Sequence, residues 1–142
     1  MKKTLVLITT LGLLSPFAHS IELTPGQWDV TVDMNAPGIP DNMRTRVKQD
    51  CLTQEQAGDL EASMRKGWKE DNCGGAEINR SGNTLRWSAV CSMPGSDAKT
   101  HISGTMVIHN DKHYTTDITV KGNHHSMKTH SEAKWVGACK EE

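Results

Sequence analysis

Six histidines follow residue 100 in the sequence, and imidazole nitrogens are common protein ligands for zinc and copper. A hairpin with its turn at Asp111 would place His109 opposite His113 and bring the remaining candidates together near its other end. The candidate metal ligands are His101, His109, His113, His124 and His125. The alternative is an exposed polar face without a ligand, which the lack of a clearly placed acidic neighbour favours.

The four cysteines could form two disulfides, for which three pairings exist. Cys73 and Cys91 are equidistant from Gly82, so a hairpin centred on that glycine makes them cross-strand neighbours. Cys51 would then pair with Cys139. A structural zinc site is the rival interpretation, but the close C-x₂-C pairs typical of such sites are missing from the sequence.

Patterns typical of enzymes are missing from the sequence, which contains no G-x-S-x-G, no H-E-x-x-H and no glycine-rich phosphate loop. The 142 residues carry 16 Lys and Arg against 17 Asp and Glu, a net charge of −1. Such a balance argues against a nucleic-acid partner, because phosphate binding requires a clear basic excess. We therefore expect a protein that is not an enzyme and does not bind nucleic acid.

Apolar and polar residues alternate over several segments, which is typical of half-buried antiparallel strands. The clearest example runs from Gly26 to Met34. The full set of expected strands is 26–34, 44–51, 73–80, 84–91, 100–109, 113–121 and a last strand from about 126 to near 139. Turn-forming residues between them, such as Ser81-Gly82-Asn83, predict hairpins.

One helix is expected between the second and third strands. Thr53 and Gln56 form a capping-box pattern, and apolar residues follow at helical spacing, so the sequence predicts a helix from Gln54 to Arg65 that ends at Gly67. The fold class that follows is mainly β: an antiparallel curved sheet or partly open β-barrel of six to seven strands, with one short helix and two disulfides.

The first 20 residues have the features of a cleavable signal peptide. Lys2 and Lys3 precede an uncharged apolar run, and Ala18 and Ser20 are small residues at the two positions that a signal peptidase reads. That run is shorter than the roughly 20 apolar residues that span a bilayer. We therefore expect a signal peptide over 1–20, no membrane anchor after cleavage, and one exported domain over 21–142.

Four large side chains fall on the apolar faces of different expected strands. These are Trp28, Trp87, Met106 and Trp135. Lining a curved sheet, they would form a concave apolar face able to bind a small apolar ligand. The alternative is that they only fill the core of a domain with few large apolar residues.

An ordered set of short motifs covers nearly all of residues 21–142. Pro25-Gly26-Gln27-Trp28 is followed by Pro37-Gly38-Ile39-Pro40, Cys51-Leu52-Thr53, Ser81-Gly82-Asn83 with Trp87 and Cys91, and Gly137-Ala138-Cys139. This order resembles a family of small exported bacterial proteins known only as a domain of unknown function. The resemblance implies a periplasmic location and four paired cysteines, and it implies no catalytic residues.

The leading hypothesis is a non-catalytic periplasmic protein that binds a small apolar ligand or a protein partner. The first alternative is a zinc or copper binder that uses the histidine-rich hairpins. The second alternative is an envelope assembly or interaction protein without a small ligand. No other cofactor is expected.

Overall fold

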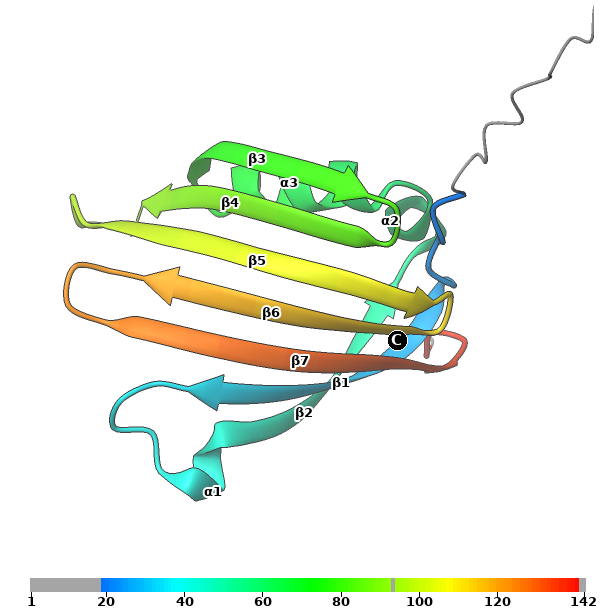
Figure 1. Cartoon of the computed structure of the whole chain (residues 1–142), viewed down its shortest axis with the longest axis horizontal. Helices are drawn as coiled ribbons and strands as arrows, with labels where there is room; N and C mark the ends of the chain where they lie inside the picture. The colour runs from blue at the N-terminus through cyan, green and yellow to red at the C-terminus, as the bar shows by residue number, and fades with distance from the viewer. Residues whose placement is uncertain (1–18, 93, 141–142) are drawn as a thin grey trace, which may run out of the picture.

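A computed structural model of the chain describes residues 19–92 and 94–140 (Figure 1). Most of the predicted signal peptide, residues 1–18, lies outside this range. The described residues form seven antiparallel strands and three helices. The strands are β1 (Gly26–Asn35), β2 (Thr45–Leu52), β3 (Cys73–Ser81), β4 (Thr84–Ser92), β5 (Lys99–Asn110), β6 (His113–Lys121) and β7 (Ser126–Gly137). None of the helices in the described ranges is long and apolar enough to cross a membrane.

The strands form one open sheet in the order β2-β1-β7-β6-β5-β4-β3. Strands β3 to β7 follow one another as a meander, and the β1–β2 hairpin is added beside β7. The predicted mainly β class, with an open antiparallel sheet and two disulfides, is confirmed. A crossover through the helices carries the chain from β2 at one edge to β3 at the other (Figure 1).

The helical region differs from the single helix predicted over 54–65. Asp59 divides it into α2 (Gln54–Gly58) and α3 (Leu60–Glu70), because its side chain accepts a hydrogen bond from the Ala62 amide at 2.9 Å and starts a new helix. Gly67 does not end α3. The next residue, Trp68, packs against the core and carries the helix on to Glu70.

A further short helix, α1 (Asp41–Arg44), forms where the sequence indicated only the end of a loop and the start of a strand. The capping box itself is confirmed, with the Thr53 and Gln56 side chains each bonded to the other's backbone amide. A capping box therefore identified where the helical region begins, but not where it breaks or ends.

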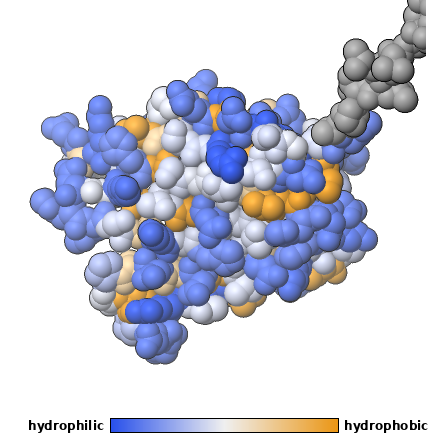
Figure 2. Space-filling model, in the orientation of Figure 1, coloured by the Kyte–Doolittle hydropathy of each residue, from blue (hydrophilic) through white to orange (hydrophobic). Residues whose placement is uncertain are grey.

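One face of the sheet, the covered face, carries the hydrophobic core and the packed side of α3. The strands supply Trp28, Val30, Leu85, Trp87, Met106, Ile108 and Ala133, and α3 adds Leu60, Met64 and Trp68. The Trp87 indole lies directly over Gly104, where any Cβ would collide with its ring. The opposite, outer face is turned to the viewer in Figures 1 and 2 and is mostly hydrophilic.

Both predicted disulfides are present, joining Cys51 to Cys139 and Cys73 to Cys91. The predicted turn of the hairpin that carries Cys73 and Cys91 was wrong. The hairpin has a two-residue turn, with Ser81 paired to Thr84, and is not centred on Gly82. A β-bulge between Gly74 and Glu77 shifts the register and brings the two cysteines opposite each other.

Candidate functional site

A cavity of about 310 Å³ lies on the covered face near the start of the helical region. We call it the ligand cavity. Its lining residues are Leu23, Trp28, Asp50, Cys51, Leu52, Gln56, Leu60, Met106 and Tyr114. The volume falls within the range of small-molecule pockets, and the mixture of aromatic and aliphatic surface with a few polar groups is typical of them.

Strand alternation explains how residues distant in the sequence meet here. Trp28, Met106 and Tyr114 lie on the covered faces of β1, β5 and β6, where apolar side chains alternate with polar ones. The Trp28 and Tyr114 rings lie 5.2 Å apart at 46°. Leu60, the first residue of α3, closes the cavity from the helical side.

The polar groups of the ligand cavity come from three elements. Tyr114 contributes a hydroxyl that makes no hydrogen bond to any described residue. Asp50 contributes a carboxylate, which is paired with Lys48 at 2.7 Å. Gln56 uses its carbonyl oxygen in the capping box, which leaves its amide NH₂ as a donor. The cavity can therefore offer hydrogen bonds to a bound molecule.

Burial raises the pKa of Tyr114 above its ordinary value of 10.0, and the negative charge of Asp50 acts in the same direction. Because this is the only tyrosine in the chain, its ionisation can be followed without interference from another phenol. We expect ultraviolet difference absorbance to show a phenolate transition above pH 10 in the native protein and near pH 10 in urea.

The raised pKa has a consequence for stability. The folded state holds the phenol proton more tightly than the unfolded state does, and this difference stabilises the fold. The stabilisation is complete below about pH 10 and is lost as the pH rises through the folded pKa. A native transition at or below that of the urea-unfolded chain would contradict the burial of Tyr114.

Two of the four residues predicted to form the apolar face line the ligand cavity, namely Trp28 and Met106. Trp87 is buried over Gly104 instead. Trp135 donates its indole N–H to the Pro25 carbonyl at 3.0 Å, and the Lys112 ammonium lies 4.7 Å from its ring centre. Neither of these two tryptophans lines the ligand cavity.

Sequence reasoning missed several lining residues, including Leu23, Leu52 and Tyr114. Tyr114 occupies a covered-face position of β6. The alternation of residues along β6 could have identified it as a lining residue. Leu23 belongs to a segment that we call the N-terminal strap, Ile21–Pro25, which is not a strand. Its fixed position depends on contacts with distant turns, which no local pattern reveals.

The N-terminal strap is held by hydrogen bonds to two hairpin turns. Asn83 accepts from the Ile21 amide at 3.0 Å, and the Arg80 guanidinium donates to the Ile21 carbonyl at 2.8 Å. Asp111 accepts from Thr24 through both its backbone and side-chain oxygens. The strap thus places Leu23 in the core and at the ligand cavity.

The candidate metal ligands do not gather at one point. His109 and His113 lie at the β5–β6 turn, with ring centres 4.6 Å apart. Asn110, rather than His109, is paired with His113 because a bulge occurs at His109. The other three candidates, His101, His124 and His125, lie toward the opposite end of β5 and β6 and in the following turn.

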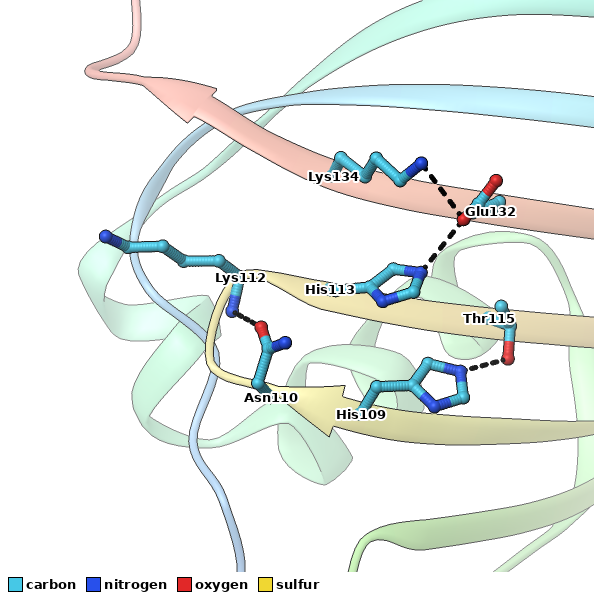
Figure 3. Close-up of polar contacts among 7 residues, drawn as sticks. All are labelled: His109, Asn110, Lys112, His113, Thr115, Glu132 and Lys134. Carbon is cyan, nitrogen blue, oxygen red and sulfur yellow. Dashed lines mark hydrogen bonds and ion pairs between the residues drawn. The ribbon is translucent and has the colours of Figure 1, made fainter.

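His109 and His113 form hydrogen bonds with other side chains on the outer face (Figure 3). The His113 Nε2 lies 3.0 Å from Glu132, and the His109 Nε2 lies 2.9 Å from Thr115. The hydrogen bond from Lys134 keeps the pKa of Glu132 below its ordinary value, with smaller contributions from the Lys134 charge and from His113. Within residues 19–92 and 94–140, no group of three or more His, Cys, Asp or Glu is arranged to hold a metal ion.

Residues 23–139 match the model of a family described as "Protein of unknown function (DUF3617)". The chain belongs to this family. No curated protein and no solved structure matches it. The DUF3617 match includes all four cysteines and every residue that lines the ligand cavity.

Proposed function

We propose that this protein is a non-catalytic periplasmic protein that holds a small apolar molecule in the ligand cavity. The observation that carries the proposal is the cavity itself: an aromatic and aliphatic lining around a tyrosine hydroxyl that is not bonded to any described residue. The hydroxyl would orient a bound molecule, while the surrounding surface would supply most of the affinity.

Two features support a periplasmic location. The first 20 residues have the pattern of an export signal. Both disulfides need an oxidising compartment to form and persist, and the bacterial periplasm is one. The location and the ligand-binding role can be tested separately.

Binding can be tested with N-phenyl-1-naphthylamine, a neutral apolar dye whose fluorescence increases in an apolar environment. We expect saturable binding to one site per chain. Replacing Leu60 with Trp should fill the cavity from α3 and weaken dye binding by about tenfold or more, equivalent to about 1.4 kcal/mol.

Met64→Trp is the matched control, because Met64 lies one turn further along α3 and does not line the cavity. Circular dichroism should verify that both variants retain the native sheet. Absence of saturable dye binding, or equal weakening by the two folded variants, would refute the proposal.

A further inference from the structure

A second apolar hollow of about 370 Å³ lies toward the other end of the sheet, and we call it the distal hollow. It is lined by Ala36, Pro37, Thr100, Val120, Gly122, His125, Ser126 and Met127. Most of its lining surface is apolar, whereas the ligand cavity has polar and apolar surface in similar amounts.

The register places both depressions on the covered face. Val120 is paired with Met127 on β7 and with Ile102 on β5. On β6, Tyr114 and Val120 are an even number of positions apart, so their side chains point to the same side of the sheet. The ligand cavity and the distal hollow are therefore two ends of one surface.

Between the two depressions, the covered face is buried at Thr116 on β6 and partly open to solvent at its apolar residues. Ile118 on β6, Val32 on β1 and Ile102 on β5 all lie on this face and are half-buried. Val120 lies six positions after Tyr114 on β6, which is about 20 Å at roughly 3.3 Å per residue. An extended alkyl chain advances about 1.3 Å per carbon for C–C bonds of about 1.5 Å, so roughly 16 carbons span that distance.

We infer that the ligand is a single-chain lipid whose head group lies in the ligand cavity and whose alkyl chain extends along β6 to the distal hollow. This inference rests on the proposed function. The polar atoms of Tyr114 and Gln56 suit the head group, and the apolar distal hollow suits the chain end. Because the Asp50 carboxylate is already paired with Lys48, no free cationic partner for an anionic head is found among the lining residues, and the head group is uncharged.

The test is displacement of N-phenyl-1-naphthylamine by 1-alkanols of increasing chain length. Affinity should rise with each added methylene, by up to about fourfold for roughly 0.8 kcal/mol per buried CH₂, until the chain reaches the distal hollow. Alkyl carboxylates of equal length should bind more weakly than the alkanols.

Val120→Asp should remove the gain for long chains, because it places a charge where the chain end would lie. Thr119→Asp is the matched control, because it adds the same charge at the neighbouring position on the outer face. It should bind the whole series like the unaltered protein.

The outcomes separate this inference from the proposed function. If neither the dye nor octanol binds, the proposed function is wrong. If both bind but the affinity of the unaltered protein stops rising beyond octanol, or if Val120→Asp and Thr119→Asp behave alike, the elongated ligand is excluded and the proposed function stands. Tighter binding of the carboxylates would overturn the assignment of the head group.

Discussion

Replacing Cys51 and Cys139 together with alanine is expected to lower the free energy of unfolding by about 4–5 kcal/mol. The two residues are 88 positions apart, and a covalent link across so long a loop removes much of the entropy of the unfolded chain. Because small domains have only about 5–15 kcal/mol of total stability, this loss is a large fraction of it. Urea denaturation followed by far-ultraviolet circular dichroism measures the difference.

The natural comparison is the double alanine variant of Cys73 and Cys91. Their separation is 18 residues, for which the same chain-entropy argument gives about 3 kcal/mol. The two double variants should therefore rank in order of loop length. A smaller loss for the Cys51–Cys139 variant than for the Cys73–Cys91 variant would show that the constraint on the unfolded chain does not dominate.

Replacing Trp28 with alanine is expected to cost about 3–5 kcal/mol, the usual range for removing a large aromatic side chain from a core. Its side chain is 1 % exposed and contacts Tyr114, and its indole N–H donates to the Thr24 carbonyl at 3.1 Å. The substitution would leave a void beside the ligand cavity and loosen the N-terminal strap. Urea unfolding should show the loss, and binding of the naphthylamine dye should weaken.

Trp28→Phe separates these effects. It retains an aromatic ring but removes the donor to Thr24, so we expect a smaller loss of about 1–2 kcal/mol. Met43→Ala is the surface control, because Met43 is 51 % exposed and should change stability by less than about 0.5 kcal/mol. If Trp28→Ala were as mild as Met43→Ala, Trp28 would not be a central core residue.

The strands were the most predictable part of this fold, because alternation is a local property. The pattern from Gly26 to Met34 is sufficient to assign both the strand and its covered face. The cysteine pairs were predicted correctly, although the bulge at Gly75, with its positive φ of 60°, was needed to align Cys73 with Cys91.

The ligand cavity was predictable only in part, because it depends on contacts between segments that are distant in the chain. Trp28 and Met106 could be placed on an apolar face from their own strands. Which part of that face remains open is decided by Leu60 at the start of α3 and by Leu23 in the N-terminal strap. Neither position follows from periodicity.

The pairing of β1 with β7 has a consequence for the order of folding. β1, the first strand in chain order, lies against β7, the last. The Trp135 indole N–H donates to the Pro25 carbonyl across 110 positions of sequence. A chain that emerges from its N-terminus can complete the β3–β4 hairpin early, but β1 has no β7 to pair with until residues 126–137 have emerged. The Cys73–Cys91 bond can therefore form before β7 has emerged, whereas the Cys51–Cys139 bond must wait until residue 139 is available.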